Sequence, residues 1–288
     1  MVESALIEEI RRRSLRISST HVTLGIGDDC ALIRPRAGEE IAITTDLSLE
    51  NVHFRRDWHP AESVGHRCLA RGLSDLAAMG ARPIGALLSL ALPITAITPD
   101  SHGISWVSRF LDGFLALAAL HNVALVGGDT AQSLISPGGK TGVITADVVL
   151  LGAIKCGRAL RRSGAKAGDL IYVTGALGGA AAEFLALQQN PDAFRAVTKA
   201  APPGIHPHLY PAPRIAVGRK LVGLATSAID LSDGLSTDLR HICDESRLAA
   251  EIYNLPLHPL AQAAEATGLS SLVLGRALTR GFDLALHL

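Results

Sequence analysis

The chain has 288 residues, of which 48% are hydrophobic, so it is long enough for two domains with buried cores. Lys plus Arg and Asp plus Glu both number 27, which excludes the basic field of a nucleic-acid-binding protein and the polybasic stretch that an anionic membrane attracts. The N-terminus lacks the features of a signal peptide and the four cysteines are widely scattered, so we expect a soluble protein of the reducing cytoplasm.

Apolar runs rich in Val and Ile alternate with helical patterns in the first half of the chain, which predicts a layered α/β (α+β) domain. In chain order, we expect helices near 3–14, 61–79 and 100–121, and strands near 41–46, 84–92, 123–127 and 141–154.

A second group of elements follows a surface turn at 164–169. The patterns predict strands at 170–174 and 226–230, and helices near 178–189, 211–223 and 235–246. We therefore expect two domains, residues 1–155 and residues 156–288.

Acidic turns recur along the chain, mostly at the edges of apolar runs. They contain Asp28 and Asp29, Asp46, Asp75, Asp129, and Asp230 with Asp233. Any one of them alone is more simply a turn or a helix cap. Together they indicate a Mg²⁺-phosphate site, because Mg²⁺ takes carboxylate oxygens and completes its shell with phosphate and water.

Two glycine-rich turns could approach a phosphate closely. Gly127 and Gly128 precede Asp129, and residues 175–179 open an alanine-rich helix, although tight strand-to-helix packing explains the second turn equally well. One arginine among Arg158, Arg161 and Arg162 could clamp a nucleotide phosphate. Phosphoryl transfer fits such a site, because positioning and charge neutralisation supply most of its catalysis.

Together, these motifs identify a family resemblance over nearly the whole chain. They are Gly-Ile-Gly-Asp-Asp-Cys-Ala-Leu at 25–32, Thr-Thr-Asp at 44–46, His-Phe at 53–54, Leu-Ser-Asp-Leu-Ala-Ala-Met-Gly-Ala at 73–81, Gly-Gly-Asp-Thr at 127–130, Gly-Arg-Ala-Leu-Arg-Arg-Ser-Gly-Ala at 157–165 and Ile-Asp-Leu-Ser-Asp-Gly-Leu at 229–235. The chain resembles the thiamine-monophosphate kinases of the aminoimidazole-ribonucleotide synthetase-like superfamily.

The resemblance implies ATP-dependent phosphorylation of thiamine monophosphate to thiamine diphosphate, with ATP as co-substrate and several Mg²⁺ ions. It also implies a homodimer in which the sheets of the two first domains join. The Mg²⁺ ligands that it implies are Asp29, Thr44, Thr45, Asp46, Asp75, Asp129, Asp230 and Asp233. The resemblance further implies nucleotide contacts at Gly128, Asp129, Arg162 and Ser232, catalytic roles for Asp46, Asp129 and Arg162, and contact of His53 with the thiamine phosphate.

The sequence departs from the family pattern near its C-terminus. The family has a Gly-Gly-Glu-Asp-Tyr-Glu-Leu segment, and here Phe282 takes the place of its first Glu. Because the family continues for a few dozen further residues, we expect an incomplete C-terminal α/β domain. The alternatives are a nucleotide-binding, catalytically impaired relative with a binding or dimerisation role, and, last, a kinase of this fold with another acceptor.

Overall fold

The computed structural model describes residues 2–14, 17, 19–133, 142–200, 202, 204–253 and 257–266. Phe282, the altered segment around it and the C-terminal end of the predicted second domain lie outside these residues. Among the described residues, no helix is both long enough and apolar enough to cross a membrane.

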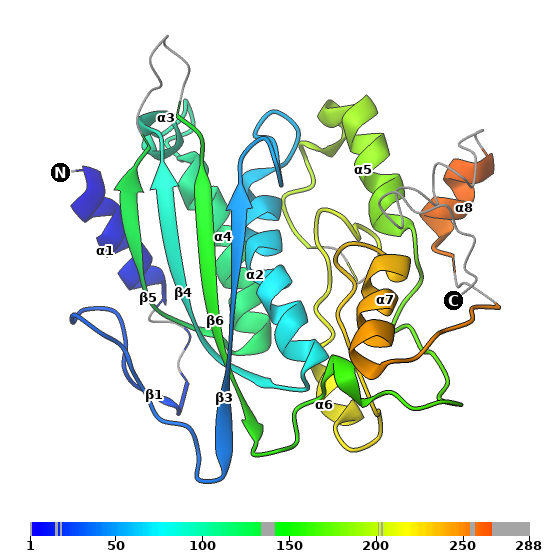
Figure 1. The fold of residues 1–288 in the computed structure, drawn as a ribbon. Helices are drawn as coiled ribbons and strands as arrows, with labels where there is room; N and C mark the ends of the chain where they lie inside the picture. Colours follow the sequence, from blue (N-terminus) through cyan, green and yellow to red (C-terminus); the bar gives the residue numbers. More distant parts are fainter. Residues whose placement is uncertain are drawn as a thin grey trace.

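The first half contains a four-stranded sheet in the order β3-β6-β4-β5, with helices on one face (Figure 1). Only β4 and β5 are parallel; β6 pairs antiparallel with both β3 and β4. The elements are α1 (Val2–Ser14), β1 (Val22–Leu24), β2 (Leu32–Ile33), β3 (Glu39–Leu49), α2 (Ala61–Ala78), β4 (Arg82–Leu92), α3 (Ile94–Ile97), α4 (Trp106–His121), β5 (Ala124–Gln132) and β6 (Thr145–Lys155).

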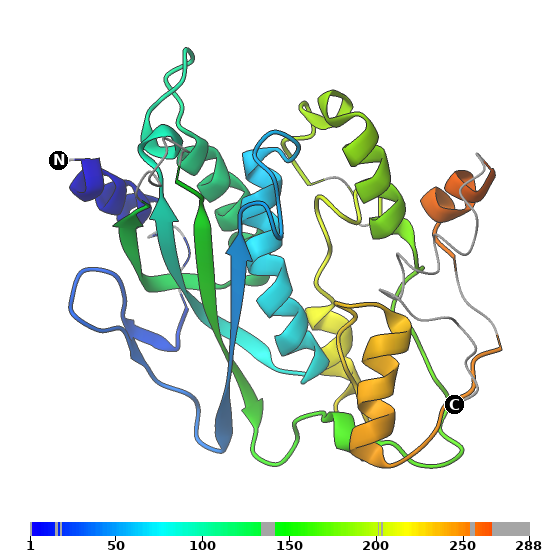
Figure 2. The ribbon, with the colours of Figure 1, turned by 45° about the horizontal axis from the view of Figure 1, so that its top comes forward.

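Helices α2 and α4 cover the sheet on one face and pack closely on each other (Figures 1 and 2). Two glycines permit this approach. A Cβ atom at Gly65 would lie 1.9 Å from the carbonyl oxygen of Phe110, and one at Gly113 would lie 1.8 Å from that of Glu62. The main core fills the space between this helix pair and the sheet, and Ile215 from the second half of the chain joins it.

The second half lies beside α2 and consists mainly of helices and irregular segments (Figure 2). Its elements are the short 3-10 helices η1 (Arg162–Gly164) and η2 (Pro191–Phe194) and the helices α5 (Gly179–Gln189), α6 (Ile215–Leu221), α7 (Leu235–Ser246) and α8 (Pro259–Ala266). The predicted α/β fold class is confirmed, and α7 has the predicted bounds.

Two predicted strands of the second half are wrong for the described structure: residues 170–174 and 226–230 are not strands. Neither segment pairs with a strand among the described residues, and a strand forms only where a neighbour completes its hydrogen bonds. Leu170 and Tyr172 are consequently 76% and 83% exposed.

The helix predicted near 100–121 begins later, at Trp106. Ser105 caps it by accepting a hydrogen bond from the backbone N–H of Ser108 at 3.2 Å. The Asp100 carboxylate holds the preceding turn by accepting from His102 and Ile104. The helix predicted near 211–223 is also shorter, because Pro211 and Pro213 precede α6 and cannot donate to a helical ladder.

Candidate active site

The acidic site begins where β3 crosses α2. Thr44 Oγ1 donates a 2.5 Å hydrogen bond to Asp75 Oδ2, and Arg71 Nη2 lies 3.0 Å from Asp46 Oδ1. Burial, with the charges of Asp75 and Asp147 and against the charge of Arg71, raises the pKa of Asp46 to about 6. The carboxylates of Asp75 and Asp147 thus both repel that of Asp46, and Arg71 compensates for part of this repulsion.

The second half of the chain brings Asp230 to the same place. Burial, with the charges of Asp75 and Asp238 and against the charge of Arg162, raises the pKa of Asp230 to about 6. Asp75 is therefore coupled both to Asp46 of the first half and to Asp230 of the second. A divalent cation would relieve this repulsion, so the donor set of oxygen atoms fits Mg²⁺.

The strand register places two predicted ligands, Thr45 and Asp129, on the other face of the sheet. Asp46, Val148, Leu88 and Gly128 lie in one row across the four strands, and the next row contains Asp147, Ser89 and Asp129. Side chains alternate between faces along a strand, so Asp46 faces the helices and Asp129 faces away from them. Asp46 on β3 and Asp129 on β5 are also three strand spacings of roughly 4.8 Å apart, about 14 Å across the sheet.

Thr45 belongs to this second, open face, where its Oγ1 donates to Asp147 Oδ1 at 2.9 Å. Asp29 is exposed in the loop between β1 and β2, and β1 contacts edge strand β5. Within the described part of the chain, no group of three or more His, Cys, Asp or Glu side chains is already arranged around a metal position. Of the predicted ligands on strands, Thr44 and Asp46 therefore lie on the helix-covered face and Thr45 and Asp129 on the other.

Gly128 is needed for the packing of β5 on β4. Its φ is +150°, and a Cβ atom would lie 1.9 Å from the carbonyl oxygen of Leu88. Strand packing therefore requires a glycine at this position, whether or not its backbone also approaches a ligand. At the turn 175–179, a Cβ on Gly179 would lie 2.5 Å from the ring of His258, so this glycine serves tight packing too.

Comparison with known proteins adds to this geometry. Residues 27–154 match the family described as AIR synthase related protein, N-terminal domain. A thiamine-monophosphate kinase of Escherichia coli O157:H7 is 40% identical over 269 residues, which cover 93% of this chain and 77% of that protein. The chain belongs to the thiamine-monophosphate kinase family.

Solved structures agree with this assignment. The thiamine-monophosphate kinase of Stenotrophomonas maltophilia K279a superposes with a TM-score of 0.75 at 37% identity, covering 97% of this chain and 82% of that one. A structure of AaThiL complexed with AMPPCP and TMP gives a TM-score of 0.69 at 28% identity, with 98% and 83% covered. The thiamine-monophosphate kinase fold therefore extends over both halves of the chain.

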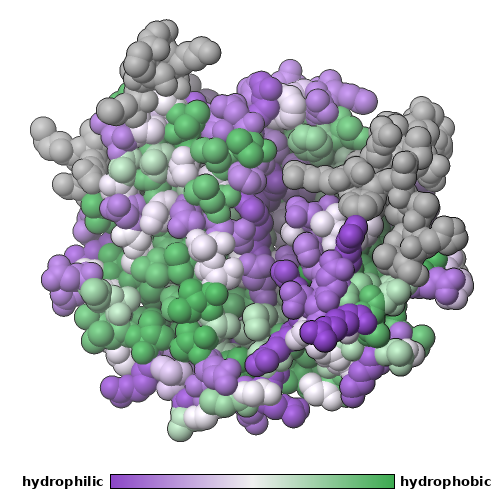
Figure 3. Space-filling model, in the orientation of Figure 1, coloured by the Kyte–Doolittle hydropathy of each residue, from purple (hydrophilic) through white to green (hydrophobic). Residues whose placement is uncertain are grey.

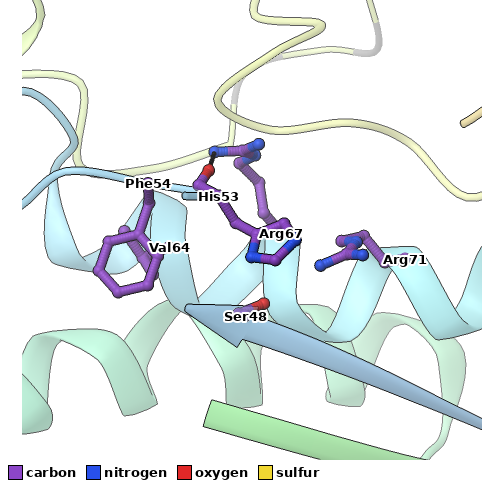
Figure 4. Close-up of a pocket in the computed structure, with 6 residues that line it drawn as sticks. All are labelled: Ser48, His53, Phe54, Val64, Arg67 and Arg71. Atoms are coloured by element: carbon purple, nitrogen blue, oxygen red, sulfur yellow. Dashed lines mark hydrogen bonds between the residues drawn. The ribbon is translucent and has the colours of Figure 1, made fainter. Parts of the chain in front are cut away.

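His53, predicted to contact the substrate, lies in a small pocket where β3 ends beside α2 (Figure 4). Its Nδ1 accepts a hydrogen bond from the backbone N–H of Leu49 at 3.0 Å, so the proton of the neutral ring is on Nε2. Arg67 Nη1 donates to the His53 carbonyl oxygen at 3.2 Å. Both contacts fix the position of His53 beside the acidic site.

Sequence reasoning missed Asp238, which holds the loop of the acidic motif at residues 229–235. Its Oδ2 accepts from the backbone N–H groups of Ser232, Asp233 and Gly234 at 3.0, 3.2 and 3.1 Å. The side chain is buried, with 3% of the residue exposed. The available signal was an acidic residue in the first turn of a predicted helix, where a side chain can reach back to backbone N–H groups at the helix start.

Asp147 and Arg71 were also missed. Neither belongs to the acidic turns, and both become neighbours of Asp46 only through strand pairing and the packing of α2 on β3. A search for acidic residues beside Gly, Ser or Thr has no means of finding them.

Proposed function

We propose that this chain transfers the γ-phosphoryl group of ATP to the phosphate of thiamine monophosphate, giving thiamine diphosphate and ADP. The observation that carries the proposal is its 40% identity, over 93% of its length, with a thiamine-monophosphate kinase. The coupling of Asp75 to both Asp46 and Asp230 supports a site assembled from both halves of the chain.

The proposed Mg²⁺ ligands are those predicted from the motifs, with Asp46, Asp75 and Asp230 at the junction of the two halves. Bound Mg²⁺ would neutralise charge on the reacting phosphates. Arg162, whose charge acts on Asp230, would contact the nucleotide phosphates together with Gly128, Asp129 and Ser232. In the reaction, an oxygen of the acceptor phosphate forms a bond to the γ-phosphorus while the bond to the β-phosphate oxygen breaks.

The proposal extends to a homodimer formed through the open face of the sheet. Ile43 is 66% exposed and Leu47 is 47% exposed on this face, beside partly buried Val149 and Leu151. The space-filling view shows apolar side chains over the sheet in this region (Figure 3). A monomer rarely leaves such a patch in water, and the same face carries Thr45 and Asp129.

The cytoplasmic location is also a proposal.

A direct assay tests the activity. The purified chain, incubated with ATP, Mg²⁺ and thiamine monophosphate, should form thiamine diphosphate and ADP in equal amounts. Asp75→Asn should lower kcat by at least about 100-fold, because it removes the carboxylate shared by both halves. A folded wild-type chain that binds ATP with Mg²⁺ but forms no thiamine diphosphate would instead support the catalytically impaired relative.

A further inference from the structure

The pocket beside the acidic site is lined by two arginines in consecutive turns of α2 (Figure 4). Arg67 and Arg71 are four residues apart, so their side chains leave the same face of the helix. Like charges at this spacing destabilise a helix unless an anion lies between or beside them. The remaining lining residues are Ser48, His53, Phe54 and Val64.

The two arginines differ in their partners. Arg71 pairs with Asp46 at 3.0 Å and donates to the Leu47 carbonyl oxygen at 2.8 Å. Arg67 donates to the His53 carbonyl oxygen, but within the described part of the chain no carboxylate lies at ion-pair distance from it. Burial and the charge of Arg71 lower the pKa of Arg67 to about 10, so it stays charged at neutral pH.

The groups around Arg67 do not neutralise it. Burial and the Arg67 charge lower the pKa values of His59 and His208, so both rings are neutral at pH 7. The charge of Glu183 raises the pKa of Arg67, but the Glu183 carboxylate makes its hydrogen bonds to the backbone N–H of His208 and to His206 Nδ1 at 2.6 Å. Arg67 is therefore balanced by no ion pair among the described residues, and its guanidinium group is open to an anion that enters the pocket.

Shape and position favour a single phosphate group rather than a nucleotide. Phe54 and Val64 form an apolar wall, and the side chains of Ser48, His53 and Arg71 converge on the same space (Figure 4). The ion pair between Arg71 and Asp46 connects the pocket to the expected Mg²⁺ carboxylates. The nucleotide residue Gly128 lies three strands from Asp46, across the sheet.

We propose that Arg67 and Arg71 form the binding subsite for the phosphate monoester of the acceptor substrate. The inference rests on the proposed function and adds two residues to it. Arg67 would supply the charge that the acceptor phosphate neutralises, and Arg71 would link that phosphate to Asp46. Guanidinium groups suit this task because they offer paired donors to phosphate oxygens.

Calorimetric binding of thiamine monophosphate, unphosphorylated thiamine and a Mg²⁺-bound non-hydrolysable ATP analogue tests the subsite. Arg67→Gln should weaken binding of thiamine monophosphate by about 10- to 100-fold, the effect of losing one charged hydrogen-bonding group. Binding of thiamine and of the analogue should change less than about twofold. Arg109→Gln is the matched control, because Arg109 pairs with Asp100 away from the site.

Arg67→Lys keeps the positive charge and covers the case in which the glutamine variant does not fold. It should bind thiamine monophosphate between about 3- and 10-fold more weakly than the wild type, because a lysine lacks the paired donors. Equal weakening of thiamine and thiamine monophosphate in either folded variant would overturn the subsite, since the loss would then not depend on the phosphate.

Inorganic phosphate separates this inference from the proposed reaction. The wild type should bind it in competition with thiamine monophosphate, and Arg67→Gln should not. Phosphate binding that depends on Arg67, in a chain that makes no thiamine diphosphate, would support the subsite and refute the proposed reaction. Thiamine diphosphate formation with an unchanged KM for thiamine monophosphate in Arg67→Gln would support the reaction and refute the subsite.

Discussion

Asp75 shows how a single residue can join two halves of a chain. Its carboxylate accepts from Thr44 and raises the pKa values of Asp46 and Asp230, which come from β3 and from the segment before α7. Asp238 fixes the second of these segments through three backbone N–H groups. The carboxylates repel one another in the absence of a cation, so cation binding should stabilise this part of the fold.

This repulsion predicts a pH-dependent response to Mg²⁺. Asp46 and Asp230 have pKa values of about 6 in the folded protein, above their ordinary 3.8, so each takes up a proton as the pH falls through 6. Protons then compete with Mg²⁺, and the Mg²⁺ affinity should fall by about tenfold between pH 7.5 and pH 5.5. The measurement is the midpoint of the thermal stabilisation by Mg²⁺ without nucleotide at the two pH values.

The direction of this pH effect follows from the difference between the folded and unfolded pKa values of the two carboxyl groups. A raised acid pKa costs stability as the pH rises from about 4 to about 6, because the unfolded chain ionises its carboxylate over this range while the folded state still holds the proton. Mg²⁺ should recover that stability above pH 6 and not below it. Equal Mg²⁺ midpoints at pH 7.5 and pH 5.5 would contradict the placement of these two carboxylates in the metal site.

At the scale of elements, the site depends on the distance between α2 and α4. α2 carries Arg67, Arg71 and Asp75, and its position is set partly by the glycine contacts with α4. A helix-to-helix contact without an intervening Cβ leaves no room for even one methyl group.

We therefore expect Gly113→Ala to destabilise the fold by about 3 kcal/mol, although alanine has the higher helix propensity. The added Cβ would lie 1.8 Å from the carbonyl oxygen of Glu62 and would push the helices apart. Urea unfolding measures the loss. Gly25→Ala is the control, since its Cβ would have no neighbour closer than 3.9 Å, and a similar loss in both variants would refute the packing argument.

At the scale of the whole molecule, the sheet is covered on one face by helices and leaves an apolar face open (Figures 1 and 3). Ile41, Ile43 and Leu47 lie along edge strand β3 on this face. Two predicted site residues, Thr45 and Asp129, also lie on this open face, whereas Asp46 and Asp75 lie on the helix-covered side. A second copy of the chain that covers this face would enclose Thr45 and Asp129.

Ile43→Glu should therefore shift the proposed dimer to monomers, because it places a charge in the contact. Leu120→Glu is the matched control: Leu120 is 73% exposed at the end of α4, away from the open face. Sedimentation equilibrium measures both variants and the wild type. A monomeric wild type, or a dimer that Ile43→Glu leaves intact, would refute dimerisation through this face.

The elements of the first half were largely predictable because their patterns are local. Strands β3 and β4 and helix α2 follow from apolar periodicity, and α7 from an amphipathic run after Gly234. Residues 170–174 have an equally apolar sequence, Leu-Ile-Tyr-Val-Thr, yet neither they nor residues 226–230 form a strand in the described structure. Periodicity records which side chains could be buried and does not say whether a partner strand is available.

The sequence by itself determined the residue types of the site and the family to which the chain belongs, because glycine, aspartate and threonine in fixed order along short motifs are local features. Only the tertiary structure decided which of them meet. Thr44, Thr45 and Asp46 are consecutive, but strand alternation sends Thr45 to the open face and the other two toward α2. Asp75 and Asp230 are far apart in sequence, and only packing of the second half beside α2 brings their charges together.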